Sequence, residues 1–112
     1  MAGSDKCVLF ICGKARMRSP TAADMVASWH GFETDFTGLS KDADELLSSE
    51  HLDWADIIVV MEKRQKSKLS SQFGAQLAAK RVVALGVADK YDYMEPALQE
   101  ILHQKLRKIL QG

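Results

Sequence analysis

The chain has 112 residues, 46% apolar and 27% charged, which is the balance of a globular protein and excludes a disordered one. Its fifteen basic and fifteen acidic side chains cancel to zero net charge, so no long-range field attracts it to nucleic acid or to an anionic membrane. We therefore expect a single domain over residues 1–112, in which any anion site is local.

The amino-terminal residues contain one lysine and a short apolar run, so we expect neither a signal peptide nor a spanning helix, and a cytosolic location. Cys7 and Cys12 are the only cysteines. On an extended strand they lie roughly 16 Å apart, whereas a disulfide needs Cα atoms within about 7 Å. Both are therefore expected to be reduced, and without a neighbouring His or further Cys they predict no zinc site.

Four apolar segments alternate with helical patterns along the chain. The predicted strands are 7–11, 32–37, 56–61 and 81–85. The predicted helices are one from Ser19-Pro20 to His30-Gly31, one short helix capped by Ser40 or Asp42, one over 62–73, and one from Pro96. Ser19 is expected to be the N-cap of the first helix and Gly31 its C′ glycine. Trp29 and Trp54 are expected in the core.

The order of these segments predicts an α/β fold. We expect a four-stranded parallel doubly wound sheet of flavodoxin-like order 2-1-3-4, with right-handed crossovers and helices on both faces. Ligands of such folds bind at the carboxyl ends of the strands. The loop that begins at Cys12 falls at this end of the sheet.

The loop between the first strand and the first helix is basic. Lys14, Arg16 and Arg18 lie within five residues, with no acid from Cys12 to Ser19. Cations at a helix N-terminus repel the positive end of its dipole unless an anion binds among them. Free backbone N–H groups then point to the same anion. The loop therefore predicts a site for phosphate or a similar oxyanion.

The spacing of Cys12 and Arg18 suits chemistry at phosphorus. The positive field favours the thiolate, which is the nucleophilic form of cysteine. Five intervening residues let the backbone curl around a tetrahedral dianion, and the planar guanidinium can bind two phosphoryl oxygens. A structural cysteine before a solvated basic turn is the alternative, but the strand before the loop and the Ser-Pro helix start after it favour a phosphate site.

Residues 8–23 resemble the signature of the low-molecular-weight protein tyrosine phosphatases: a strand, Cys12, five residues, Arg18, Ser-Pro and a helix. Thr37-Gly38 is similar to the turn after the family's second strand, and residues 53–62 are similar to the segment around its third strand. The resemblance implies hydrolysis of a phosphomonoester through a phosphocysteine on Cys12, with Arg18 as phosphate clamp and without metal or cofactor.

The resemblance also assigns roles to the rest of the loop. Its backbone amides would stabilise the equatorial phosphoryl oxygens. These loop residues are Gly13, Lys14, Ala15, Arg16 and Met17. Ser19 would donate a hydrogen bond to the thiolate. This role competes with helix capping, because both would use the same hydroxyl.

Asp89 is the expected general acid, because Asp89-Lys90-Tyr91 can be placed on the family's Asp-Pro-Tyr motif after the fourth strand. It would protonate the leaving oxygen and later deprotonate the attacking water, which contributes roughly 10²–10⁴-fold in rate. Asp92 and Glu95 are neighbouring alternatives.

The middle of the loop departs from the family pattern. The family has an asparagine there, suited to a left-handed backbone, whereas this chain has Ala15. A left-handed alanine is disfavoured by about 1–2 kcal/mol, so Gly13 is an alternative place for the turn. The chain also resembles a short variant of the family, with fewer residues between the second and third strands.

The expected partner is a phosphorylated substrate, first of all a phosphotyrosine protein, and Tyr91, Tyr93 and His51 are candidates for the wall around it. A nucleotide, sugar or nucleic-acid phosphate end is an alternative substrate, for which Lys14 and Arg16 supply extra charge. A weakly catalytic phosphate-binding module is another alternative. An arsenate reductase is less favoured, because a thioredoxin-coupled relay needs further cysteines.

Overall fold

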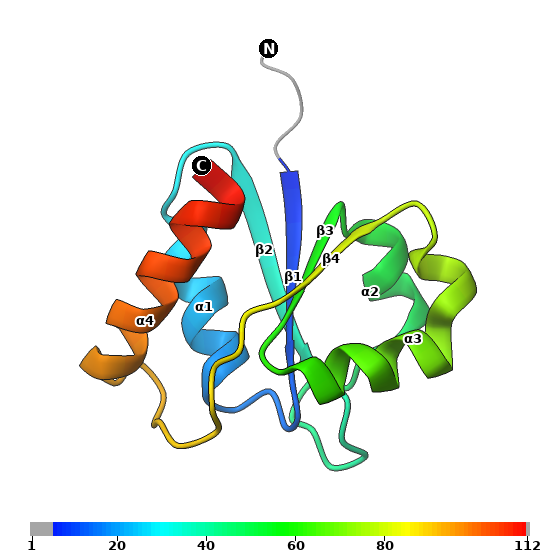
Figure 1. Cartoon of the computed structure of the whole chain (residues 1–112), viewed down its shortest axis with the longest axis horizontal. Coiled ribbons are helices and arrows are strands. Elements are labelled where there is room, and N and C mark those ends of the chain that lie inside the picture. Colours follow the sequence, from blue (N-terminus) through cyan, green and yellow to red (C-terminus); the bar gives the residue numbers. More distant parts are fainter. Residues whose placement is uncertain (1–5, 112) are drawn as a thin grey trace.

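The computed structural model describes residues 6–111, in which strands and helices alternate. The elements are β1 (Lys6–Cys12), α1 (Arg18–Ala27), β2 (Phe32–Gly38), α2 (Ser49–Trp54), β3 (Ile57–Val60), α3 (Lys63–Leu77), β4 (Arg81–Ala84), α4 (Pro96–Leu106) and a final π-helical turn (Arg107–Gln111). Figure 1 shows the strands side by side between two groups of helices.

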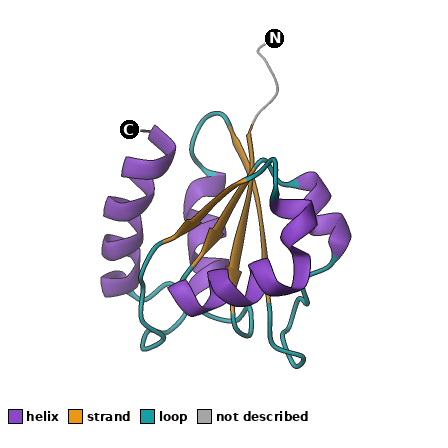
Figure 2. Ribbon diagram, turned by 45° about the vertical axis from the view of Figure 1, so that its right-hand side comes forward, coloured by secondary structure: helices purple, strands orange, loops and turns teal. Residues whose placement is uncertain are grey.

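The four strands form one parallel sheet in the order β2-β1-β3-β4, which confirms the predicted fold class and strand order. Helices α1 and α4 contact each other on one face of the sheet, and α2 and α3 contact each other on the other face. The ribbon in Figure 2 shows both faces covered. The sheet is therefore doubly wound, and its central strand β1 is buried from both sides.

The apolar run of β1 supplies both halves of the core, because successive side chains of a strand point to opposite faces. Val8 and Phe10 join the cluster under α1 and α4. Leu9 and Ile11 join the cluster under α2 and α3. All four side chains are fully buried, which explains why this strand lacks the polar alternation of a half-exposed strand.

The ends of the first helix differ from the prediction. Its N-cap residue is Met17, so Ser19 lies inside the helix and does not cap it. The helix ends at Ala27, and Gly31 instead turns the chain into β2 with a φ of +92°. The N-terminal difference arises because the buried first turn of α1 follows the geometry of the preceding loop rather than the nearest capping residue.

The helices after β2 also begin and end elsewhere. The short helix is capped by Ser48, not by Ser40 or Asp42. The helix predicted over 62–73 runs from Lys63 to Leu77, and Phe73 has non-helical angles (φ −133°, ψ 24°), so the predicted end is a kink. Among the tryptophans, Trp29 packs against the core, but Trp54 is 36% exposed, so its placement in the core was wrong.

The carboxyl ends of all four strands meet at one end of the molecule (Figure 1, bottom). The loops that leave β1, β2, β3 and β4 therefore lie together there, as parallel topology requires. Within residues 6–111, no helix is both long enough and apolar enough to span a membrane.

Candidate active site

The loop after β1 folds around the sulfur of Cys12. The Ala15 backbone N–H donates to Sγ at 3.2 Å, and the Ser19 hydroxyl lies 3.0 Å from Sγ. The Ser19 oxygen also lies 3.4 Å from the Thr37 carbonyl, so its single proton can serve either partner. Cys12 and Ser19 are both buried, and no disulfide joins Cys12 to Cys7. The helix-capping proposal for Ser19 is therefore replaced by a contact with the sulfur.

Ala15 provides the turn of this loop. Its φ is +60°, in the left-handed region, while the described glycines with positive φ are Gly31 and Gly86. The alternative that Gly13 makes the turn is therefore wrong. An alanine in this conformation is strained by about 1–2 kcal/mol, and here the strain places its N–H on the sulfur.

Gly38 lets the loop and the end of β2 come into contact. A Cβ atom there would lie 2.4 Å from the Gly13 carbonyl oxygen and 3.0 Å from the Ala15 nitrogen, too close for any side chain. The Leu39 and Ser40 N–H groups donate to the carbonyls of Cys12 and Gly13 at 3.0 and 2.8 Å. The residues after β2 therefore support the loop from behind, and only glycine fits at their contact.

Arg18 is held by residues that follow β3 and β4. Its Nη1 donates to the Glu62 carboxylate at 2.6 Å and to the Val87 carbonyl at 2.7 Å. Its Nε lies 3.7 Å from the Asp89 carboxylate. The hydrogen bond from Arg18 holds the pKa of Glu62 below its ordinary value, against the opposing effect of burial. With a side chain only 3% exposed, Arg18 is fixed in one orientation.

Lys14 and Arg16 are paired with acids of the β2–α2 loop. Lys14 lies 3.3 Å from Asp42, and Arg16 lies 3.0 Å from Asp44. The hydrogen bond to Asp44 raises the pKa of Arg16. Each acid lies 28 residues after its basic partner in sequence, and neither was part of the predicted site. Arg18 is paired with Glu62 in the same way, so the expected cluster of three uncompensated cations is not present.

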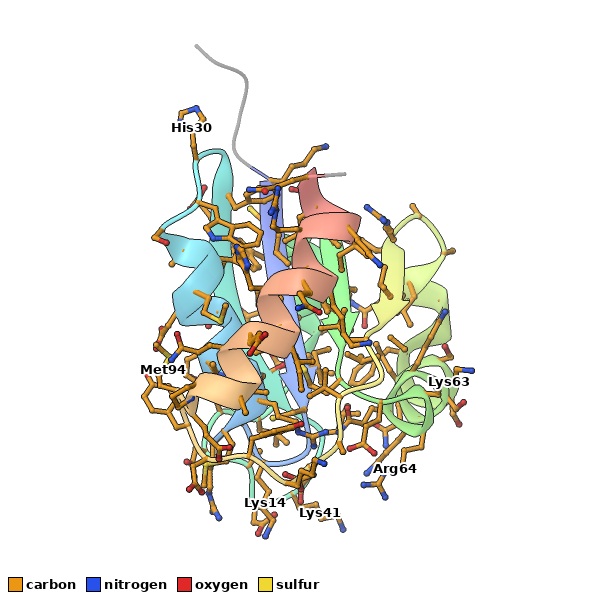
Figure 3. All side chains as sticks on the ribbon, turned by 60° about the vertical axis from the view of Figure 1, so that its left-hand side comes forward. Lys14, His30, Lys41, Lys63, Arg64 and Met94 are labelled. Atoms are coloured by element: carbon orange, nitrogen blue, oxygen red, sulfur yellow. The ribbon has the colours of Figure 1, made fainter. Side chains whose placement is uncertain are left out.

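A pocket of 370 Å³ opens above Cys12. It is lined by Cys12, Gly13, Lys14, Arg16, Met17, Arg18, Ser40, Arg64, Gln65 and Asp89. Figure 3 shows Lys14, Lys41 and Arg64 at this end of the molecule, with His30 at the opposite end. Of the three acids proposed as general acid, Asp89 lines the pocket, whereas Glu95 is the N-cap of α4 and accepts the Asp92 N–H at 3.1 Å.

The three candidate wall residues lie elsewhere, which corrects that expectation. Tyr91 packs against the core beside α4. Tyr93 donates to the Asp24 carboxylate, which raises the pKa of Tyr93. His51 accepts the Ser48 N–H at 3.0 Å in the capping box of α2. No aromatic side chain is among the described residues that line the Cys12 pocket.

Sequence reasoning missed Ser40, Arg64 and Gln65, which line the pocket, and Glu62, which accepts a hydrogen bond from Arg18. A signal for two of them was present, because Glu62 and Gln65 directly follow a buried strand and have the spacing of a capping box. Residues just after any strand of a parallel sheet lie at the ligand-binding end. Within residues 6–111, no group of three or more His, Cys, Asp or Glu is arranged to hold a metal ion.

No protein-family model and no curated protein matches the sequence. Solved structures do resemble it. The YwlE arginine phosphatase from Geobacillus stearothermophilus is 19% identical, with a TM-score of 0.71 and coverage of 95% of this chain and 93% of that one. The low molecular weight protein tyrosine phosphatase SP-PTP from Streptococcus pyogenes is 12% identical, with a TM-score of 0.72 and coverage of 94% and 93%.

A third similar structure is DARP, an arginine phosphatase of Drosophila. It is 15% identical to this chain, with a TM-score of 0.68 and coverage of 93% of this chain and 95% of that one. The three structures thus share one architecture at low sequence identity. This chain has the fold of the low molecular weight protein tyrosine phosphatases and of the related arginine phosphatases.

Proposed function

We propose that the protein is a cysteine-dependent phosphatase of the low-molecular-weight protein tyrosine phosphatase family. The observation that carries the proposal is the buried Cys12 sulfur at the base of a pocket, within reach of the Ala15 N–H and the Ser19 hydroxyl. A sulfur that accepts the Ala15 N–H and lies beside the Ser19 hydroxyl is placed to act as the nucleophile. We retain the cytosol as the expected location, since this thiol must stay reduced.

The reaction has two steps. The Cys12 thiolate attacks phosphorus, and the phosphorus–oxygen bond to the leaving group breaks as that oxygen takes a proton from Asp89. A water molecule then gives a proton to the Asp89 carboxylate, and its oxygen attacks phosphorus, which releases the thiolate and inorganic phosphate. The 66% exposure of the Asp89 carboxylate is suited to proton exchange at the pocket mouth.

Arg18 and the loop amides stabilise the transferring group. In the described residues Arg18 Nη1 donates to Glu62 and Val87, while Nη2 donates to no protein atom and is available to a phosphoryl oxygen. Its fixed orientation means that little reorganisation accompanies the reaction, which is how preorganised donors lower a barrier. The loop from Gly13 to Arg18 supplies backbone N–H groups next to the α1 N-terminus, where negative charge is favoured.

Two classes of phosphorylated substrate fit this proposal. Phosphotyrosine is supported by the shared fold with a tyrosine phosphatase. A phosphate on a non-aromatic group is favoured by one observation, the lack of an aromatic side chain in the described lining of the pocket. Phosphoarginine belongs to this second class, as do sugar and nucleotide phosphates.

The test is hydrolysis of an aryl phosphate, an alkyl phosphate and a phosphoarginine peptide by the wild type, Cys12→Ser and Cys7→Ser. We expect turnover by the wild type and by Cys7→Ser, because Cys7 lies at the opposite end of β1. Cys12→Ser should be inactive, and the wild type should form an acid-labile or base-labile phosphocysteine that Cys12→Ser does not form. Turnover that survives in Cys12→Ser contradicts the proposal.

Asp89→Asn tests whether Asp89, rather than Asp92 or Glu95, is the general acid. We expect a loss of roughly 10²–10⁴-fold in kcat, largest for the alkyl phosphate because its leaving oxygen most needs a proton. Asp92→Asn and Glu95→Gln are the matched controls and should keep most of the activity, since neither residue lines the pocket. Full activity of Asp89→Asn would contradict the assignment.

A further inference from the structure

Gln65 is a buried polar side chain in the wall of the Cys12 pocket that the reaction above does not use. It lies in the first turn of α3, is 7% exposed, and lines the pocket together with Cys12, Arg18 and Asp89. Buried amides in proteins are normally fully hydrogen-bonded. The partners of its two ends therefore indicate what the side chain does.

The orientation of the Gln65 amide is set by its donors. Its Oε1 accepts the Met61 N–H at 3.1 Å and the Glu62 N–H at 3.0 Å. Because both partners are donors, only the oxygen can occupy that position, and the opposite end must be the NH₂ group. The amide is therefore held in one orientation by the capping box at the start of α3.

The NH₂ group of Gln65 is accessible at the pocket end of the molecule. Among the described residues, Gln65 Nε2 donates to no protein atom. An atom that is both shielded from solvent and without a partner occurs in the described residues at Thr37 Oγ1, not at Gln65 Nε2. Nε2 is therefore not enclosed. Gln65 lines the Cys12 pocket and an adjoining hollow that shares Gly13, Ser40 and Arg64 with it, so the space next to Nε2 lies at this end of the molecule.

The anchor of this amide lies next to the nucleophile. The Met61 N–H is shared between Gln65 Oε1 and the carbonyl oxygen of Ile11, at 3.2 Å from the latter. Ile11 immediately precedes Cys12, and Ile11 is paired with Val60 across the two strands. The carboxamide therefore sits at the adjoining ends of β1 and β3, beside the base of the pocket.

We propose that Gln65 Nε2 donates a hydrogen bond to an oxygen of the phosphoryl group bound above Cys12, which makes Gln65 a further catalytic residue. This inference rests on the proposed phosphatase function. A neutral donor held in place by two backbone groups stabilises phosphoryl charge with little reorganisation. A glutamate would cap the helix equally well, but it would place a second carboxylate beside Glu62 and against the phosphate.

The decisive variant is Gln65→Glu. Its carboxylate keeps an acceptor for the Met61 and Glu62 N–H groups but replaces the donor with a negative charge. Gln72→Glu is the matched control, because Gln72 is exposed on α3 two turns later and receives the same change of charge. Gln65→Met removes donor and acceptor together without adding charge.

Two measurements are made on each variant: the thermal midpoint with and without inorganic phosphate, and kcat/KM on the substrate turned over best. We expect Gln65→Glu and Gln65→Met to bind phosphate at least about tenfold more weakly than the wild type and to lose about 10²-fold in kcat/KM. Without phosphate, Gln65→Glu should melt somewhat below Gln72→Glu, because its carboxylate lies beside Glu62, whereas Gln72→Glu should bind phosphate normally.

Phosphate affinity and kcat/KM of Gln65→Glu equal to those of Gln72→Glu overturn the proposal. So does a lower midpoint without phosphate combined with normal phosphate affinity, which would assign Gln65 a purely structural role. The phosphate arm needs no turnover. If the wild type is inactive on every substrate, the proposed function fails, and phosphate binding still decides the role of Gln65.

Discussion

Ala15→Gly tests whether the loop around Cys12 is strained. Ala15 has a φ of +60°, a conformation that disfavours an alanine by about 1–2 kcal/mol relative to glycine. Glycine also increases the entropy of the unfolded chain, which lowers stability by about 0.4–1 kcal/mol. The difference predicts a net stabilisation of about 0.5–1 kcal/mol. For a domain of this size that is a rise of about 2–5 °C in the thermal midpoint.

The assay is reversible thermal unfolding of the wild type, Ala15→Gly and Ala97→Gly. Ala97 is exposed in the first turn of α4, where its backbone is helical, so glycine should lower stability by at most about 1 kcal/mol. The two glycine variants should therefore move in opposite directions. A midpoint of Ala15→Gly that is unchanged or lowered, beside a lowered Ala97→Gly, would refute the strain at residue 15.

Gly38→Ala should abolish phosphate binding and lower stability, because its Cβ would lie 2.4 Å from the Gly13 carbonyl oxygen, whereas Gly74→Ala meets open space on α3 and should raise the thermal midpoint. Glu62→Gln should melt earlier at pH 7. The pKa of Glu62 is lowered on folding, so the stabilisation that its carboxylate provides is present above the usual pKa near 4.5. That stabilisation is lost as the pH falls through the folded pKa. The variant should therefore lose less stability in acid than the wild type. Asp44→Asn should bind phosphate a few-fold more tightly at low ionic strength and equally at high salt, because it releases Arg16; equal affinities at both salt concentrations would contradict this.

The fold could be predicted because its strands are simple in pattern. Continuous apolar runs such as 7–11 belong to strands that are covered on both faces, and their alternation with helices leaves a parallel, doubly wound sheet as the natural solution. Helix ends were less predictable. Ser19 is a residue type that favours the N-cap position, but its hydroxyl contacts the Cys12 sulfur and the N-cap is Met17. The contact at the site therefore overrides the local capping preference.

The part of the site within the loop could be anticipated, since Cys12, Arg18 and Ser19 are close in sequence. The rest depends on contacts between distant segments. Asp42 and Asp44 compensate the loop cations, and nothing in the local pattern of a polar, acid-rich segment shows that its charges face residues 14–16. The aromatic side chains of the β4–α4 loop failed as pocket residues for the same reason, because their partners are on α1 and α4.

The partners of Cys12 and Arg18 differ in how much of the fold they need. The sulfur contacts groups three and seven residues away, whereas the guanidinium is held by groups 44 and 69 residues away, beyond β3 and β4. Local opening of α3 and β4 would therefore release Arg18 and leave the environment of the sulfur in place. The oxyanion site is therefore complete only when β3 and β4 are both in place beside β1.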